Sequence, residues 1–438
     1  SGTMDFSEYA DGTTDCTAFL QQEIDRTIVG GRLVIPSGTY LTGALFLHSD
    51  MTLELEKGAV ILGIADEKAY PLIPSRVAGI EMEAWPAGLI NAQGCENLTI
   101  CGEGTIDGQG EYWWDKFWGK PEEQHRGGMI REYPSALRWA VDYDCFRPRN
   151  ILCGNCKNLT LKDFKCERSG FWNIHVYYSE NVSIDHLIIG ENAGPSTDGI
   201  DIDSCQHVVI KNCQISCNDD GIVLKAGRDA DGLRVNRPCE DVEIANCHLS
   251  GLSQGITLGS ETSGGIRKVF IHDCDFDGTV RGFRVKSART RGGVIENIVV
   301  KNLTMQNVRC PIEFGLNWFP EYSYCKIPED YKGEIPEYWK VLTQHVPPEV
   351  GLPLLRNVTV ESVQACADSA HTKKASYEQP VLFYIDTDPV RPVENITFRN
   401  VILDGERLGK IRSVKNMRLE NVQISVCEET ENAAAAED

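Results

Sequence analysis

Short segments in which apolar and polar residues alternate recur along most of the chain, and many of them begin with asparagine. A period of two is the pattern of a half-buried β-strand, because successive side chains point to opposite faces. From Leu98 to Met417, equivalent apolar residues are separated by 61, 23, 26, 34, 27, 29, 60, 38 and 21 residues. The intervals of 60 and 61 residues fit either a coil whose strand lacks the recognisable pattern or a coil that carries a long insertion. The segments are 97–100, 158–161, 181–184, four centred on Val208, Val242, Val269 and Ile298, and then 357–360, 395–398 and 416–419.

A second strand-like segment soon follows many of the first ones, and it places an apolar residue at the same point of the repeat. These segments are 212–215, 246–249, 273–276, 302–305 and 400–403, with cysteine at that point in the first three. Stacked repeats bring equivalent side chains above one another, so cysteine serves there as a small apolar residue. Most of the 17 cysteines are therefore expected to form an interior ladder.

The repeat predicts an all-β fold, a right-handed parallel β-helix. Its short strands are separated by Gly, Asn and Asp, and most recur every 21 to 34 residues with no helical pattern between them. A leucine-rich repeat has a similar period, but its L-x-x-L-x-L-x-x-N signature is absent, and a propeller blade needs about 40 residues. Since a solenoid grows as one unit, residues 1–427 are expected to form a single domain.

Four segments depart from the repeat. A capping helix is expected over 14–28, starting at Thr14 or Asp15, with Phe19, Leu20, Ile24 and Ile28 on the face that covers the end of the solenoid. Residues 310–353 form an aromatic-rich insertion, either a packed loop or one wall of a sugar-binding groove. The acidic tail 428–438 is expected to be disordered, and residues 1–3 before Met4 resemble a cloning scar.

The net charge of −21 argues against a nucleic-acid partner, which would require clustered Lys and Arg over a broad face. No apolar run of about 18 residues exists to cross a membrane. Locally, however, the segment 281–291 (RGFRVKSARTR) carries five basic residues and no acid. This cluster is either a solvated strand edge or a binding site for an anionic substrate.

The N-terminal sequence and the cysteines bear on the compartment. If Met4 is the natural start, no basic and apolar leader follows it, and we expect a cytoplasmic protein with reduced thiols. A signal peptide removed upstream would leave the same sequence, so a secreted or periplasmic location stays open.

The densest group of carboxylates within the repeat combines Asp198 with Asp219 and Asp220. Asp198 and Asp219 are 21 residues apart, one coil, which puts them on neighbouring rungs about 4.8 Å apart. Repulsion between such close carboxylates raises the pKa of at least one of them. Inverting cleavage of a glycosidic bond needs a protonated acid and an ionised base, about 6.5–9.5 Å apart. Calcium ligation or turn formation are the alternative roles.

Around these residues the chain resembles the polygalacturonase family, glycoside hydrolase family 28, and especially its bacterial exo-acting members. The resemblance extends from about residue 12 to residue 421. The family motif Asn-Thr-Asp appears as Ser196-Thr197-Asp198, Asp-Asp as Asp219-Asp220, and Arg-Ile-Lys as Arg284-Val285-Lys286. The three motifs stand in the family's order and at coil spacing.

The resemblance implies a role for each matching residue. Asp219 matches the acid that protonates the leaving group, while Asp198 and Asp220 match the pair that orients and deprotonates water. Arg284 and Lys286 match residues that bind a galacturonate carboxylate, a task that suits a guanidinium and an ammonium group.

The family's Gly-His-Gly motif is altered to Ser253-Gln254-Gly255, so that Ser253 or Gln254 replaces the histidine. The resemblance implies that this histidine tunes the acid, so its loss affects the preferred sugar more than the reaction. Gln254 can form hydrogen bonds but cannot titrate. Further candidate substrate contacts are His175, one coil before Asp198, and Lys225 after Asp220; the histidine is alternatively structural.

Together these features predict an inverting hydrolase of α-linked galacturonate in pectin-derived polysaccharide or oligosaccharide, exo-acting and with neither cofactor nor metal. The nearest alternative is a rhamnogalacturonan-directed hydrolase with rhamnose or a branched galacturonate at the cleaved position. A calcium-dependent pectate lyase and a non-catalytic pectin-binding protein are rivals from other classes. The partner is thus an acidic saccharide, without nucleic acid or membrane, and the oligomeric state stays open.

Overall fold

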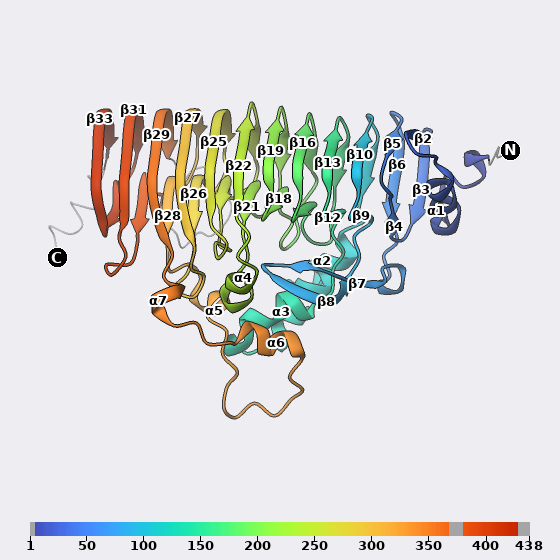
Figure 1. The fold of residues 1–438 in the computed structure, drawn as a ribbon, viewed down its shortest axis with the longest axis horizontal. Coiled ribbons are helices and arrows are strands. Elements are labelled where there is room, and N and C mark those ends of the chain that lie inside the picture. Colours follow the sequence, from blue (N-terminus) through green and yellow to red (C-terminus); the bar gives the residue numbers. More distant parts are fainter. Residues whose placement is uncertain (1–4, 368–379, 428–438) are drawn as a thin grey trace.

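The computed structural model describes residues 5–367 and 380–427, which form a parallel β-helix with helices and a hairpin attached along one flank (Figure 1). The solenoid is right-handed, as parallel β-crossovers are. The predicted all-β fold is therefore confirmed. The predicted scar at 1–3 and the predicted disordered tail at 428–438 lie outside the described residues.

One face of the solenoid is an 11-stranded parallel sheet with strands paired in chain order. Its strands are β4 (Leu45–Phe46), β9 (Ile90–Gln93), β12 (Ile151–Gly154), β15 (Ile174–Tyr177), β18 (Ile200–Asp203), β21 (Ile222–Lys225), β24 (Ile256–Leu258), β26 (Arg281–Lys286), β28 (Cys310–Gly315), β30 (Phe383–Asp386) and β32 (Gly409–Arg412).

The remaining faces form a 20-stranded parallel sheet whose two strand runs merge from β25 onward, because later strands bend continuously around the solenoid. These strands are β1 (Asp11–Asp15), β2 (Gly31–Ile35), β3 (Gly38–Thr42), β5 (Met51–Leu55), β6 (Ala59–Gly63), β10 (Glu96–Cys101), β11 (Thr105–Asp107), β13 (Lys157–Lys162), β14 (Lys165–Glu167), β16 (Glu180–Asp185), β17 (Ile188–Gly190), β19 (Gln206–Lys211), β20 (Gln214–Ser216), β22 (Cys239–Ala245), β23 (His248–Ser250), β25 (Ile266–Asp277), β27 (Val294–Gln306), β29 (Leu354–Ala367), β31 (Val393–Gly405) and β33 (Val414–Val426).

The attached elements lie together beside the 11-stranded sheet (Figure 1). They are the antiparallel hairpin β7 (Leu72–Val77) and β8 (Ile80–Pro86), and the helices α2 (Glu111–Trp118), α3 (Arg138–Asp144), α4 (Asp229–Val235), α5 (Pro320–Ser323), α6 (Glu337–Leu342) and α7 (Pro348–Gly351). Single 3-10 turns occur at Phe6–Glu8, Glu67–Ala69, Pro121–Glu123, Met129–Glu132 and Ser135–Leu137. No helix among the described residues is long and apolar enough to cross a membrane.

Asparagine marks the turns for a geometric reason. Asn97, Asn158 and Asn181 have φ of 54°, 56° and 59°, the left-handed region that asparagine tolerates better than most residues. Their side chains also bond along the solenoid, since Nδ2 of Asn181 donates to Oδ1 of Asn158 at 2.9 Å, and Asn158 donates likewise to Asn97 at 2.9 Å. Each turn therefore supports the next one.

The cysteines behave as the repeat predicts. All 17 are free thiols and 14 of them are buried, so cysteine here is a packing residue. Cys153, Cys205 and Cys247, for example, have no exposed surface and belong to the continuous apolar core of the solenoid.

A helix covers the N-terminal end of the solenoid, as expected, but it is shorter than predicted (Figure 1). Helix α1 (Thr17–Arg26) buries Phe19, Leu20 and Ile24. Ile28 was predicted on the same face and is 76% exposed, because the helix ends at Arg26 and the chain turns away. The backbone N–H of Thr17 donates to Oδ1 of Asp15 at 2.9 Å, so Asp15 stabilises the start of the helix.

We predict that Asn181→Ala lowers the free energy of unfolding by about 1–2 kcal/mol, through backbone strain at positive φ and the lost side-chain bond. Asn181→Gly should restore the backbone part, because glycine adopts this conformation freely. Urea denaturation of both variants tests the explanation. If the alanine and glycine variants lost the same free energy of unfolding, the positive φ at this position would contribute nothing to stability.

Candidate active site

The three predicted aspartates meet on the outer face of the 11-stranded sheet. Asp198 lies in the turn before β18, and Asp219 with Asp220 in the turn before β21. One oxygen from each of the three carboxylates lies within 4.8 Å of the others. These oxygens are closer than the range of about 6.5–9.5 Å expected for an inverting pair, so spacing alone does not fix the stereochemistry.

The environment shifts the pKa values of two of these carboxyl groups in opposite directions. Burial raises the pKa of Asp198 well above its ordinary value, and the charges of Asp219 and Asp220 raise it further. Burial also opposes ionisation of Asp220, but Lys286 and Lys225 outweigh it and hold the pKa of Asp220 below its ordinary value. Nζ of Lys286 lies 3.0 Å from Oδ2 of Asp220. The site thus favours a protonated Asp198 beside an ionised Asp220, so that one carboxylate of the cluster keeps its charge and can accept a proton.

The predicted cations border these acids. Lys286 lies at the end of β26, and its ammonium group is 4.1 Å from the ring centre of Trp318. Arg284, on the same strand, places Nε 2.6 Å from Oε2 of Glu313. Lys225 pairs with Glu261 and donates to the carbonyl of Gly259 at 3.2 Å. The structure therefore brings all three predicted cations to the outer face of the sheet, near the aspartates.

A pocket opens above the aspartates, with walls that come from outside the repeat. Its lining combines the acids and Lys225 and Lys286 with Ala78, Arg138, Asp142, Phe171, Trp172, Ser196, Glu261, Trp318, Phe319 and Tyr322. The predicted insertion 310–353 begins later than expected, because Cys310–Gly315 is strand β28 of the sheet, and the segment after it has both of the roles considered for it. Its first part, around α5, forms a wall of the pocket, whereas Trp339 of α6 packs on Trp139 with ring centres 5.2 Å apart.

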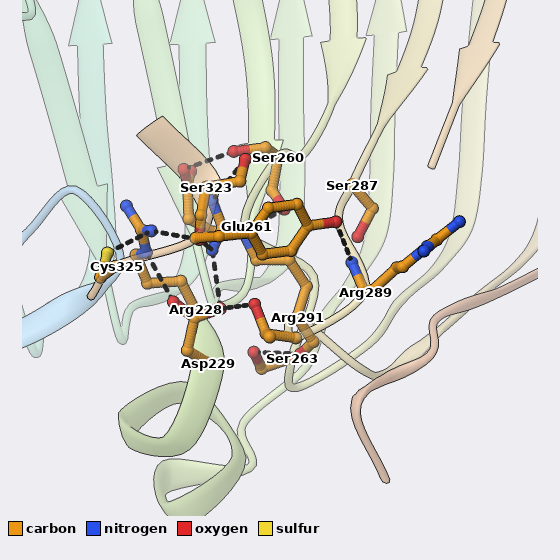
Figure 2. Close-up of polar contacts among 12 residues, drawn as sticks. Arg228, Asp229, Ser260, Glu261, Ser263, Ser287, Arg289, Arg291, Ser323 and Cys325 are labelled. Atoms are coloured by element: carbon orange, nitrogen blue, oxygen red, sulfur yellow. Dashed lines mark hydrogen bonds and ion pairs between the residues drawn. The ribbon is translucent and has the colours of Figure 1, made fainter. Parts of the chain in front are cut away.

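Two buried arginines fix the wall formed by α5 (Figure 2). Nη2 of Arg228 donates to the carbonyls of Tyr322 and Ser323, each at 3.1 Å. Nη1 of Arg291 donates to Asp229 at 2.7 Å, and Nε of Arg228 donates to the same carboxylate at 3.0 Å. Because Asp229 forms ion pairs with both guanidinium groups, the wall is held by charge-assisted bonds that are removed from water.

Three charged residues of the lining were not singled out by sequence reasoning. Arg138 and Asp142 form an ion pair one helical turn apart on α3, inside an insertion that the repeat does not mark. Glu261 lies in the turn after β24 and pairs with Lys225. The sequence indicates Glu261 only through its place about one coil beyond Lys225, since a buried lysine requires an acidic partner.

His175 was predicted as a sugar contact, and this prediction is wrong for the described structure. The imidazole has no exposed surface. Its Nε2 lies 3.1 Å from Asp203, and its Nδ1 lies 2.9 Å from Arg149. Burial lowers the pKa of His175 to about 4, so the ring is neutral and structural at pH 7. Trp172 packs against it and occupies the pocket lining in its place.

The side chain of Gln254 contacts a basic residue, whereas the resemblance implies a position that tunes the acid. Its Oε1 accepts a hydrogen bond from Arg281, and Nε of Arg281 donates to Glu313 at 3.0 Å. Glu313 also contacts Arg284, so an uncharged amide begins a chain of polar contacts that ends at a predicted substrate-binding arginine. Gln254 does not line the pocket of the aspartates.

A parallel β-helix that carries clustered, electrostatically distinct carboxylates beneath aromatic and basic walls is the architecture of a β-helical glycoside hydrolase. Residues 141–328 match the family described as Glycosyl hydrolases family 28. Over these residues the chain is similar to this family.

Known proteins similar to the chain agree with this assignment. A "Probable polygalacturonase" of Vitis vinifera is 32% identical over 321 residues, 70% of this chain and 60% of the relative. An "Exo-poly-alpha-D-galacturonosidase" of Dickeya chrysanthemi is 27% identical over 332 residues, 68% of this chain and 54% of the relative. The chain thus spans less than two thirds of these two relatives. The crystal structure of a hyperthermoactive exopolygalacturonase from Thermotoga maritima superposes with a TM-score of 0.74 at 28% identity, covering 96% of this chain and 91% of that one.

The pKa values of the buried Asp198 and Asp229 are shifted in opposite directions, and this difference gives a stability prediction. The folded protein holds a proton on Asp198 at pH values where the unfolded chain has lost it, so this group destabilises the fold increasingly as pH rises above its ordinary pKa. We expect Asp198→Asn to raise the free energy of unfolding at pH 7 by about 1–3 kcal/mol while abolishing activity, and the gain should shrink near pH 4.

Asp229→Asn is the matched control. Burial opposes its ionisation, but Arg291 and Arg228 hold the pKa of Asp229 below its ordinary value, so its contribution is present above that value and is lost as pH falls. Removing this charge should cost about 3–5 kcal/mol at pH 7, because two buried guanidinium groups lose their counter-ion. If urea denaturation gave both variants a higher free energy of unfolding than the wild type, or both a lower one, the opposite pKa shifts of Asp198 and Asp229 would be contradicted.

A second prediction concerns the missing histidine. Gln254 cannot titrate, so the pH profile of kcat/KM should show no limb from this position, whereas Gln254→His should add one near pH 6–7. Gln214→His, on the exposed strand β20, is the control and should add none. A Gln254→His profile that superposes on that of the wild type would rule out a tuning role for this position.

Proposed function

We propose that the chain hydrolyses α-linked galacturonate in pectin-derived polysaccharide or oligosaccharide, releasing sugars from one end with inversion. The observation that carries the proposal is the carboxylate of Asp220, 3.0 Å from Nζ of Lys286, with Asp219 in the same turn and Asp198 on the neighbouring rung. A turn-forming role would not require the burial of such charges, since exposed aspartates serve in turns without it.

Each aspartate and each cation of the site has its own role in the proposed reaction. Asp219 donates a proton to the leaving glycosidic oxygen, as its motif implies. Asp220 accepts the proton of the attacking water, because its charge is retained by Lys286, and Asp198 orients that water. Arg284 and Lys286 bind the carboxylate beside the cleaved bond, replacing part of their present contacts with Glu313 and Asp220.

Exo action is supported by the shape of the pocket. Ala78 at the tip of the β7–β8 hairpin, Arg138 of α3 and Tyr322 of α5 all contribute to its lining. The hairpin and α3 lie nearer the N-terminal end of the solenoid than α5 does (Figure 1), so we expect a long saccharide to extend toward the C-terminal rungs. The Dickeya and Thermotoga relatives carry names of exo-acting enzymes, in accord with this arrangement.

The second candidate is a rhamnogalacturonan-directed hydrolase. Gln254 favours it, because a neutral amide replaces the histidine of the family motif and turns toward Arg281. The three carboxylates would carry out the same reaction, and only the sugar at the cleaved position would differ. Incubation with polygalacturonate, rhamnogalacturonan and their oligosaccharides distinguishes the two functions by their products.

Asp219→Asn tests the enzymatic assignment. Loss of the acid should lower kcat about 10²–10⁴-fold on oligogalacturonates, measured as reducing sugar. Asp277→Asn, at the exposed end of β25, is the control and should match the wild type. Equal rates for Asp219→Asn and the wild type would refute catalysis. An ultraviolet-absorbing unsaturated product would indicate a lyase, and an α-anomer formed first in NMR would refute inversion.

A further inference from the structure

Strand β18 places two buried aspartates on the outer face of the sheet, and their surroundings differ. Neither Asp201 nor Asp203 has exposed surface. Nη1 of Arg76 lies 3.2 Å from Oδ1 of Asp203, and Nε2 of His175 lies 3.1 Å from Oδ2 of the same group. Burial opposes the ionisation of Asp203, but Arg76 and His175 outweigh it and hold its pKa below the ordinary value. Asp203 is therefore an anion with two partners.

Asp201 has no such partners. Within residues 5–367 and 380–427, no N–H group and no hydroxyl group donates to either of its oxygens. Its neighbours in the sheet are His175 and Val223. Both ring nitrogens of His175 contact other residues, Arg149 and Asp203, and Val223 has no polar side-chain group. A carboxylate in this place would be buried without a donor, so the group is expected to keep its proton.

The nearby cations have other partners. The charge of Lys225 acts on Asp201, but Nζ of Lys225 pairs with Glu261 and donates to a main-chain carbonyl. Arg149 donates to a main-chain carbonyl and to a serine hydroxyl. Burial therefore raises the pKa of Asp201 well above its ordinary value, and the charge of Asp198 raises it further.

The remaining contact of Asp201 is with Asp198, whose side chain is in hydrogen-bonding contact with it. Two carboxyl groups can form this bond only when one of them carries a proton, since a carboxylate is an acceptor alone. Burial keeps the pKa values of both groups high, but the bond itself lowers that of Asp198 and raises that of Asp201. Asp201 is therefore the donor of the bond.

Asp201 lies beneath the pocket of the aspartates and does not line it, whereas Asp198 does. On the next rung, Oδ1 of Asp220 accepts a hydrogen bond from the buried hydroxyl of Thr257 at 2.8 Å. Thr257 occupies the same outward column as Asp201, two rungs farther along the solenoid. One column of the sheet thus provides an O–H donor to each of the two acids assigned to water.

We propose that Asp201 is a positioning residue, a neutral carboxylic acid whose O–H group donates to Asp198 and fixes the carboxyl group that orients the attacking water. The proposal rests on the proposed function, in which Asp198 has this task. Because Asp201 does not line the pocket, it affects kcat through Asp198 and leaves KM unchanged.

Infrared spectroscopy at pH 7 tests the position of the proton. A neutral carboxylic acid absorbs above the amide and carboxylate bands, and Asp201→Asn should lose a band of this kind relative to the wild type. Asp203→Asn is the matched control, because it removes an equally buried but ionised group from the same strand, and it should keep every such band. If Asp201→Asn lost a carboxylate band instead, Asp201 would be an anion and the proposal would be overturned.

The rate on trigalacturonate tests the positioning role. The amide of Asp201→Asn can still donate to Asp198, whereas Asp201→Leu has no donor. We expect kcat within about threefold of the wild type for the asparagine variant and about 10²-fold lower for the leucine variant, with KM unchanged in both. Leucine suits a buried column that already contains Val223, and a thermal melt checks that both variants fold. Equal kcat values for the two variants would refute the positioning role.

The two measurements separate this proposal from the proposed function. If the wild type hydrolyses trigalacturonate but Asp201→Asn loses no carboxylic acid band, the neutral acid is refuted and the hydrolase stands. If the band is lost but the wild type hydrolyses no galacturonide, the hydrolase and the positioning role are refuted together, and the protonated Asp201 stands.

Discussion

The regular stacking of parallel rungs, about 4.8 Å apart, is the constraint on which the rest of this molecule depends. It places equivalent residues directly above one another, so each position of the coil becomes a column of similar environment. Inward columns are apolar and continuous, and outward columns collect polar groups. Asp198 and Asp220 meet because they occupy corresponding turns of successive coils. A site of this kind requires no loop closure, since the backbone ladder already fixes its spacing.

Concentrating acids in such a column has an energetic cost that neighbouring charges offset. Lys286 and Lys225 stabilise the anionic Asp220, while Asp198 is left with a raised pKa. Farther out, Arg228 and Arg291 share Asp229 and hold the aromatic wall in place. Reactive and structural charges thus lie in one layer between the sheet and the inserted segments, where Asp198 has a raised pKa and the supporting charges are paired.

Sequence reasoning succeeded where the repeat constrains the residue. Period-two alternation, asparagine at turns and interior cysteines all follow from stacking. The interval of about one coil placed the acids on neighbouring rungs, although the register makes Asp220, not Asp219, the residue that corresponds to Asp198. The sequence did not predict the surroundings of a residue where these are formed by segments distant in the chain. Arg138 reaches the pocket from an insertion without periodicity, and His175 is covered by side chains such as Trp172 that its own strand pattern does not reveal. Helix α1 was located, but its end was not, because no capping residue in the sequence marks Arg26.

The interior cysteines have a consequence for how opening of the solenoid can be observed. Thiolate chemistry needs solvent access, and in the folded chain only Cys366 and Cys427 are exposed. The buried thiols are distributed from Cys16 in the first coil to Cys310 on β28. Because each coil contacts only its neighbours, the ends can open before the middle. The order in which an alkylating reagent modifies these sulfurs therefore records the order in which the coils come apart, without any label being introduced.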